Sequence, residues 1–109
     1  MKRFGQTIHL RPEVEVEYRK IHVKIWPEIE DAIRVSGIRN YSIFLKDGVM
    51  FAYFEYIGPD DEFEARMETL SNAPRMQEWW GITKAMQIPL PTRAEGEWWA
   101  NMEEVFHQD

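Results

Sequence analysis

The chain has 109 residues, of which 44% are hydrophobic and 14% aromatic, and it carries a formal net charge of −6. This length and apolar content predict one globular domain over residues 1–109 with a single core. The acidic balance argues against nucleic acid or an anionic membrane as a partner, because both bind basic surfaces. The sequence contains no cysteine, which excludes disulfides, thiolate metal ligands and cysteine nucleophiles.

No segment predicts export or membrane insertion. Residues 1–7 have a basic tip but no apolar stretch behind it, so they do not resemble a secretory signal. The longest apolar run, residues 49–54, is far too short to span a bilayer. We therefore expect a soluble cytoplasmic protein.

The chain begins with a predicted strand and two predicted helices. Residues 4–10 form the strand, and the Arg-Pro pair at 11–12 ends it because proline cannot donate a ladder hydrogen bond. A helical pattern starts at Glu13 and is interrupted by Pro27. The residue before a proline avoids the helical region, so we expect a break near Trp26 and a second helix with Pro27 in its first turn. Gly37 is well placed to end that second helix.

A β-hairpin gives the clearest signal of secondary structure. Residues 38–46 and 49–57 are two β-rich runs joined by Asp47-Gly48, a dipeptide typical of two-residue turns. This register pairs Leu45 with Met50, Ile43 with Ala52, and Tyr41 with Phe54 on one face. Both faces of the hairpin are largely apolar, so we expect helices to cover one face and a second subunit to cover the other.

The second half predicts two more helices and a last strand. Residues 60–70 form an acidic helix, Asn72 caps a further helix that runs to about Gln87, and residues 102–107 form the strand. The resulting β-α-β-β-α-β order is the split βαβ, or ferredoxin-like, arrangement of the α+β class, an antiparallel sheet with helices on one face. Two such sheets commonly pair through their open faces into a dimeric α/β barrel.

Tyr18, His22 and Trp26 are the first candidates for a functional site. They are spaced four residues apart, so in a helix they stack on one face. Each of these side chains has a polar tip that needs a partner, which favours a small polar pocket over a plain core. An unperturbed histidine pKa near ~6.5 suits proton transfer, so His22 is the candidate acid-base group.

Trp79, Trp80 and Tyr41 are further candidates for ligand contacts. Adjacent helical residues point about 100° apart, so one tryptophan of the pair can pack in the core while the other borders a cleft. Tyr41 opens the hairpin, where its phenol can reach a ligand or merely end a strand. The three histidines have no metal-binding spacing, and the sequence has no Gly-rich phosphate loop, so we expect neither a metal nor a nucleotide.

These residues resemble the L-rhamnose mutarotase family over nearly the whole chain. The resemblance rests on a set of residues and motifs in the expected order: Tyr18, His22, Ile25-Trp26-Pro27-Glu28, Gly37, Asn40-Tyr41-Ser42-Ile43, Trp79-Trp80 and Glu104-Val105-Phe106. It implies a small, cofactor-free isomerase with a ferredoxin-like fold that dimerises through its sheets. Its reaction would interconvert the α and β anomers of a 6-deoxy-L-hexose.

The resemblance also implies roles for single residues. His22 matches the family's catalytic proton donor, and Tyr18, Tyr41, Trp79 and Trp80 match its sugar contacts. Our hypothesis from the sequence is that His22 protonates the ring oxygen of the sugar. The base at the anomeric hydroxyl stays open between Tyr18 and a water molecule. Trp26 is expected to be a scaffold residue that holds the histidine in place.

Two questions stay open at this stage. Rhamnose-type members usually carry a stretch like Asn-Pro-Asp-Asn-Ser-Pro after the last long helix, whereas residues 87–99 of this chain differ from it. L-fucose is therefore an alternative sugar. Two alternative functions fit the same fold. One is that of a cofactor-free monooxygenase or haem-degrading protein, and the other is that of a non-catalytic sugar-binding module.

Overall fold

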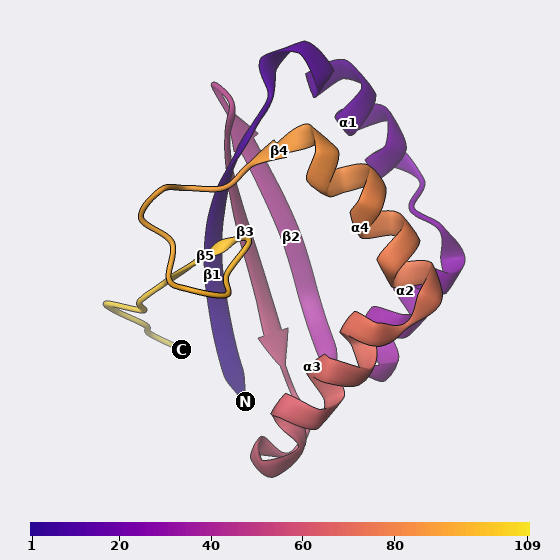
Figure 1. The fold of residues 1–109 in the computed structure, drawn as a ribbon. Helices are drawn as coiled ribbons and strands as arrows, with labels where there is room; N and C mark the ends of the chain where they lie inside the picture. The colour runs from indigo at the N-terminus through magenta and orange to yellow at the C-terminus, as the bar shows by residue number, and fades with distance from the viewer.

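The computed structural model describes residues 1–109 as a curved antiparallel sheet with helices along one face (Figure 1). The elements in chain order are β1 (Lys2–Leu10), α1 (Glu15–Val23), α2 (Pro27–Val35), β2 (Ile38–Lys46), β3 (Val49–Tyr56), α3 (Phe63–Asn72), α4 (Pro74–Met86), β4 (Gln87–Ile88) and β5 (Ala100–Met102). Short 3-10 turns, Pro12–Val14 and Asp60–Glu62, precede α1 and α3.

The sheet has the strand order β2-β3-β1-β4, which confirms the predicted split βαβ topology. The outer edge of β1 carries two short strands instead of one long strand. β4 pairs with His9 and Leu10, whereas β5 pairs with residues 5–7. Residues 89–99 leave the sheet between these two strands and form a loop.

The predicted last strand was placed too far along the chain. The structure has a strand at Ala100–Met102, and residues 103–109 have no regular secondary structure. Beyond Met102 the chain is tied to β1 by a side-chain ion pair, Arg3 to Glu104 at 2.9 Å, in place of backbone pairing. The partly alternating pattern of residues 102–107 therefore did not correspond to a paired strand.

The hairpin is confirmed next to its turn, but the predicted register fails further along. Leu45 pairs with Met50 and Ile43 with Ala52, as expected. The ladder is interrupted between Arg39 and Ser42 by one extra residue, so Tyr41 has no ladder partner. Asn40 adopts a positive φ of 54° at this bulge, a conformation that asparagine tolerates better than most residues. The Tyr41 ring still lies against Phe54, with centroids 5.3 Å apart.

The helix break at Pro27 is confirmed. Trp26 has an extended backbone, with φ −55° and ψ 132°, and Pro27 occupies the first turn of α2. The expected cap at Asn72 was wrong. α3 runs through Asn72, and α4 begins after Ala73 with Pro74 in its first turn and no side-chain cap. Pro74 has no N–H, so α4 begins with one unpaired backbone donor fewer.

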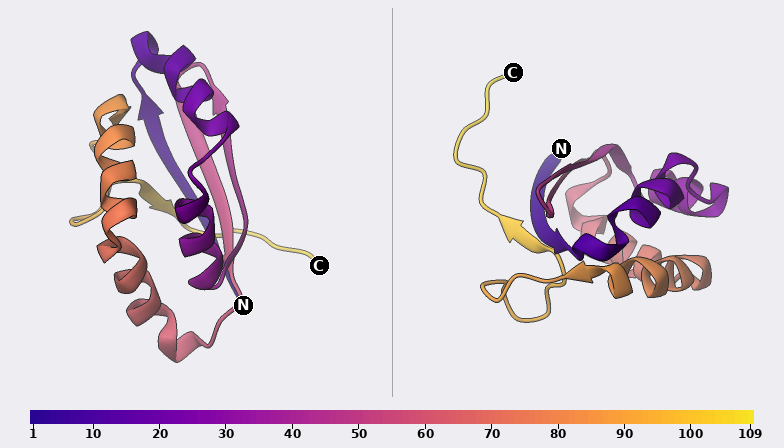
Figure 2. Two further views of the ribbon diagram at one scale, coloured as in Figure 1. Left: turned by 90° about the vertical axis from the view of Figure 1, so that its right-hand side faces the viewer. Right: turned by 90° about the horizontal axis from the view of Figure 1, so that it is seen from above.

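The two faces of the sheet differ in what covers them. Helix-facing residues of β1 and β3 are buried, including Ile8, Met50 and Ala52. On the opposite face Phe44 is 61% exposed, and Phe51 is also exposed. Figure 2 shows the helices on one side of the sheet and the C-terminal segment leaving on the side away from them. This chain alone therefore covers one face only.

The helices are short, and α4 is the longest at 13 residues. No helix has both the length and the apolar character needed to cross a membrane.

Gly37 gives a test of this fold. It ends α2 with a φ of +96°, and a Cβ there would lie 3.0 Å from the ring of the buried Tyr56. Gly37→Ala should lower the free energy of unfolding by about 1–3 kcal/mol because of this backbone strain. Thermal unfolding followed by circular dichroism measures the change.

Gly81→Ala is the matched control. Gly81 lies within α4, and a Cβ there would have no neighbour within 4 Å. That variant should be as stable as the parent chain or more stable, by up to about 1 kcal/mol, because alanine favours a helix over glycine. Equal destabilisation by both substitutions would contradict the account of Gly37.

Candidate functional site

Tyr18, His22 and Trp79 lie in contact between α1 and α4. The Tyr18 and His22 rings stack with their centroids 4.2 Å apart, as their spacing on one face of α1 predicted. Trp79 comes from α4 and meets the His22 ring edge-on at 5.3 Å. Residues far apart in the sequence therefore form one aromatic cluster around a histidine.

The hydrogen bond at one ring nitrogen of His22 fixes its tautomer. Nδ1 lies 2.7 Å from the backbone carbonyl oxygen of Tyr18. A carbonyl oxygen can only accept, so Nδ1 carries a hydrogen and donates it. In the neutral ring Nε2 then has a free lone pair, and no side chain or backbone group of this protein occupies it.

Burial sets the charge of His22. It lowers the pKa of the imidazole, because the charged form loses hydration, while the hydrogen bond to the Tyr18 carbonyl raises it in part. The net direction is downward from the ordinary value. His22 is therefore neutral at neutral pH and presents Nε2 as a proton acceptor.

Trp26 packs against the Trp79 ring of this cluster. Its ring meets Trp79 edge-on at 5.2 Å, and the guanidinium of Arg75 lies over the same ring, 4.0 Å from its centroid. Trp26 has no ring contact with His22 itself and is linked to it through Trp79. This arrangement agrees with the scaffold role expected for Trp26.

The two tyrosines of the site differ from the other two tyrosines in their hydrogen bonds. Tyr53 donates to Glu55 and Tyr56 donates to the carbonyl of Pro59. The Tyr18 hydroxyl accepts a hydrogen bond but donates to no protein group, and the Tyr41 hydroxyl makes no hydrogen bond to the protein. Two phenolic O–H groups are thus available to a ligand.

Burial keeps both phenols protonated. It raises the pKa of Tyr18, although the hydrogen bond from Gln87 lowers that pKa in part. Tyr41 as a whole is 41% exposed, but loss of hydration around its hydroxyl raises its pKa to about 12, and the neighbouring phenol of Tyr18 adds to this rise. The hydroxyl of Tyr41, on β2, is thus near that of Tyr18, on α1.

Gln87 is a member of the site that the sequence pattern did not reveal. Its side chain is 3% exposed, and its amide nitrogen donates to the Tyr18 hydroxyl over 3.1 Å. Its amide oxygen accepts from the indole N–H of Trp98 at 2.8 Å. The only signal in the sequence was that residues 87–99 depart from the usual rhamnose-type stretch.

Trp80 packs against the cluster of Ile29, Met76 and Trp79 and has no ring contact with Tyr18, His22 or Tyr41. Trp79 is 7% exposed whereas Trp80 is only partly buried, so the adjacent pair diverges as expected. The Lys84 ammonium lies 5.2 Å from the Trp80 ring centroid and 5.4 Å from that of Trp98. Trp80 therefore lies on the side of α4 that meets the loop of residues 89–99.

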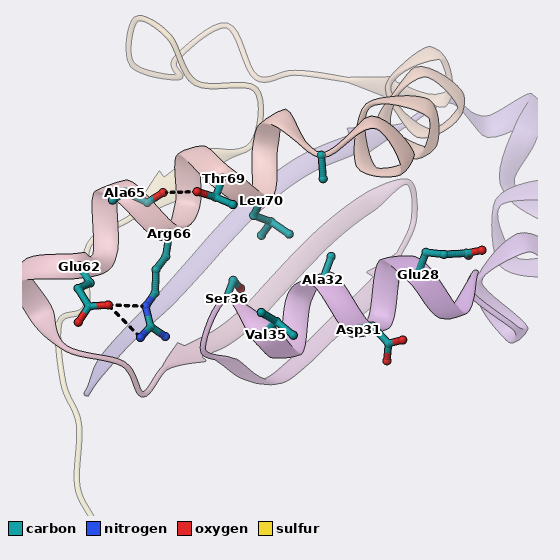
Figure 3. A pocket seen from close by; sticks show the side chains of 11 residues that line it. Glu28, Asp31, Ala32, Val35, Ser36, Glu62, Ala65, Arg66, Thr69 and Leu70 are labelled. Carbon is teal, nitrogen blue, oxygen red and sulfur yellow. Dashed lines mark hydrogen bonds and ion pairs between the residues drawn. The ribbon is translucent and has the colours of Figure 1, made fainter.

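A separate groove of about 710 Å³ lies between α2 and α3 (Figure 3). Small apolar side chains such as Ala32 and Ala65 line it, and its one cation, Arg66, is paired with Glu62 at 3.0 Å. It contains no aromatic or histidine side chain and none of the predicted site residues. It offers no group that exchanges protons near neutral pH, so the candidate site is the one around His22.

The side chains present set the chemistry that the candidate site can perform. No group of three or more His, Cys, Asp or Glu side chains that could hold a metal ion occurs in the structure. What the site offers is a proton acceptor, His22, beside two protonated phenols and flat aromatic surfaces. This set suits general acid-base catalysis on a small hydroxylated ligand.

Among the solved structures with a similar fold, two examples match this chain from end to end. The first is an L-rhamnose mutarotase from Formosa agariphila, with a TM-score of 0.77 and 22% identity over 100% of both chains. The second is the tetracenomycin F2 cyclase of Streptomyces glaucescens, with a TM-score of 0.71 and 14% identity, covering 100% of this chain and 98% of that one. Both confirm the fold class, the ferredoxin-like unit of dimeric α/β barrels.

Comparison of sequences is more specific. The model of the L-rhamnose mutarotase family matches residues 3–108. An L-rhamnose mutarotase of Lactiplantibacillus plantarum is 35% identical over the full length of both chains. One from Burkholderia cenocepacia is 36% identical over 98% of each. A family model that spans nearly every residue, and relatives this similar from end to end, show that the chain belongs to the L-rhamnose mutarotase family.

Proposed function

We propose that this chain is a mutarotase that interconverts the α and β anomers of L-rhamnose by general acid-base catalysis. Membership of the family supports the sugar and the reaction class. The observation that carries the mechanism is the pairing of a neutral His22, whose Nε2 is open, with a Tyr18 hydroxyl whose proton no protein group accepts. One group can take a proton while the other gives one.

The proton transfers follow from these two states. His22 Nε2 removes the proton of the anomeric hydroxyl, a C=O bond forms at C1, and the bond from C1 to the ring oxygen breaks. The ring oxygen takes the proton of the Tyr18 hydroxyl. The open aldehyde then rotates about C1–C2, and the reverse transfers close the ring with the other configuration. No electrons are exchanged with a cofactor at any step.

This assignment reverses the roles that we expected from the sequence. A histidine whose pKa is lowered by burial is mostly unprotonated at Nε2 at neutral pH, whereas a tyrosine whose pKa is raised keeps its proton. His22 thus suits the base of ring opening and Tyr18 the acid. The charges formed, imidazolium and phenolate, arise on stacked neighbours, where they stabilise each other.

Tyr41 and Trp79 supply contacts for the sugar in this proposal. The Tyr41 hydroxyl can hydrogen-bond to a ring hydroxyl, and the Trp79 indole provides an apolar wall for the C–H groups. Trp80 stays a proposed sugar contact, reached from the side of α4 that faces the loop of residues 89–99. L-rhamnose and L-fucose differ in the orientation of their hydroxyl groups, so these contacts would decide between the two sugars.

NMR saturation transfer between the anomeric protons tests the function. L-rhamnose should exchange anomers faster with the protein than without it, and faster than L-fucose under the same conditions. His22→Ala should reduce the catalysed rate by about 10²-fold or more, because positioned acid-base groups contribute ~10²–10⁴-fold. An uncatalysed rate with both sugars would refute the proposal, and a faster rate with L-fucose would reassign the sugar.

The pH dependence distinguishes the two assignments of His22. If neutral His22 is the base, the exchange rate should be constant above neutral pH and fall as the pH drops. The midpoint should lie below the ordinary histidine value of about 6.5, because burial lowers the pKa. A rate that rises as the pH falls through this range would show that protonated His22 is the acid.

The proposal includes a homodimer formed through the open sheet face. Phe44 and Phe51 pair in the hairpin with ring centroids 6.3 Å apart and are exposed, as are Val105 and Phe106 of the C-terminal segment. Exposed aromatic residues gathered on one face mark an association surface. A second copy would bury the same residues on both subunits.

Light scattering coupled to size exclusion tests the dimer. The parent chain should have twice the mass of one chain, and Phe44→Glu should shift it to one chain, because the new carboxylate would be buried without a partner. Val35→Glu is the control, since Val35 is exposed on α2, away from the sheet face. A single-chain mass for the parent, or a dimeric Phe44→Glu, would contradict the proposal.

A further inference from the structure

Trp98, Gln87 and Tyr18 form a chain of two hydrogen bonds that links the loop of residues 89–99 to the candidate acid. Trp98 Nε1 donates to Gln87 Oε1 over 2.8 Å, and Gln87 Nε2 donates to the Tyr18 hydroxyl over 3.1 Å. Gln87 is buried, so its amide has no solvent alternative. No step of the proposed reaction involves Gln87 or Trp98 directly.

The donor and acceptor chemistry of Trp98, Gln87 and Tyr18 allows the two hydrogen bonds to run in one direction only. An indole N–H can only donate, so the amide oxygen of Gln87 must face Trp98. The amide NH₂ must then face Tyr18, and the tyrosine oxygen must accept. A hydroxyl that accepts at its oxygen keeps its own proton for another partner. The orientation of one buried amide therefore determines that Tyr18 is a donor toward the ligand.

The position of Trp98 is itself fixed from two sides. The Lys84 ammonium lies 5.4 Å from the indole centroid. The preceding residue, Glu97, accepts hydrogen bonds from the Ala94 backbone N–H at 3.0 Å and from the Asn101 amide at 2.6 Å. These contacts tie the end of the loop to β5, so the indole N–H is held toward Gln87.

We propose that Gln87, oriented by Trp98, is a positioning residue that keeps the Tyr18 hydroxyl as a proton donor to the substrate. This inference rests on the proposed acid role of Tyr18. Gln87 does not touch the reacting atoms in this account. Its amide also stabilises the negative charge that grows on Tyr18 as the proton leaves, in agreement with its lowering effect on the pKa of Tyr18.

Gln87→Glu is the decisive variant. Glutamate has nearly the same shape as glutamine, but its ionised side chain can only accept hydrogen bonds and cannot donate them. An ionised carboxylate still accepts from Trp98, but it can only accept from Tyr18, so the tyrosine O–H would point at residue 87 and no longer at the sugar. The exchange rate at pH 8 should fall by about 10²-fold, the lower end of what a positioned acid contributes. At lower pH the protonated carboxyl can donate to Tyr18 again, so the rate of the variant relative to that of the parent chain at the same pH should rise.

A ratio of variant rate to parent rate that rises as the pH falls would not be produced by a merely structural role of Gln87. Gln87→Leu removes the donor without adding a charge, so it should lose activity without recovery at low pH. Gln77→Glu, the same change at an exposed position of α4, should keep the parent rate. Full activity of Gln87→Glu at pH 8, or a loss that is the same at every pH, would overturn the proposal.

A measurement without sugar separates this inference from the proposed function. In protein labelled with ¹³C at the tyrosine Cζ, Gln87→Leu should shift the Tyr18 signal and raise the pH at which Tyr18 ionises. Trp98→Phe frees the amide of Gln87 to turn and should shift the same signal even if Gln87→Glu fails to fold. An unmoved Tyr18 signal in both variants would overturn the role of Gln87, whether or not the parent chain exchanges anomers.

Discussion

The hydrogen bond from His22 Nδ1 to the carbonyl of Tyr18 is the interaction on which the rest of the site depends. It uses the one-turn spacing of α1 to hold the ring and to leave Nε2 as the reactive nitrogen. The same spacing stacks the two rings, so the acid and the base of the proposed reaction are positioned by a single helical turn. Any change that unwinds this turn would remove the tautomer, the orientation and the stacking together.

Packing of aromatic side chains, and not an ion pair, holds this turn of α1 in place. Trp79 contacts the imidazole, Trp26 contacts Trp79, and the Arg75 guanidinium lies over the Trp26 ring. Trp26 itself lies outside both helices, in the extended segment that ends where Pro27 begins α2. A near-neutral, aromatic surrounding also explains why the histidine pKa is lowered by burial and is not raised by a carboxylate.

Local signals in the sequence predicted the elements that depend on local chemistry. The Asp47-Gly48 turn, the break at Pro27 and the end of α2 at Gly37 each require a particular backbone conformation, and each was found. The bulge at Asn40 and the division of the last strand into β4 and β5 depend on partners far away in the chain, and neither was predicted. Gln87 was missed for the same reason, since its two partners lie 69 and 11 residues away.

The division of the edge strand has a consequence for how such proteins diversify. Both ends of the segment 89–99 are anchored by backbone pairing to the same strand, β1, so its length and composition can change without altering the register of the sheet. The segment still reaches the phenol of Tyr18 through an indole and an amide. Variation in this loop can therefore retune the acidity of the Tyr18 phenol while the scaffold and the base stay as they are. Selection could adjust reactivity there at little risk to folding.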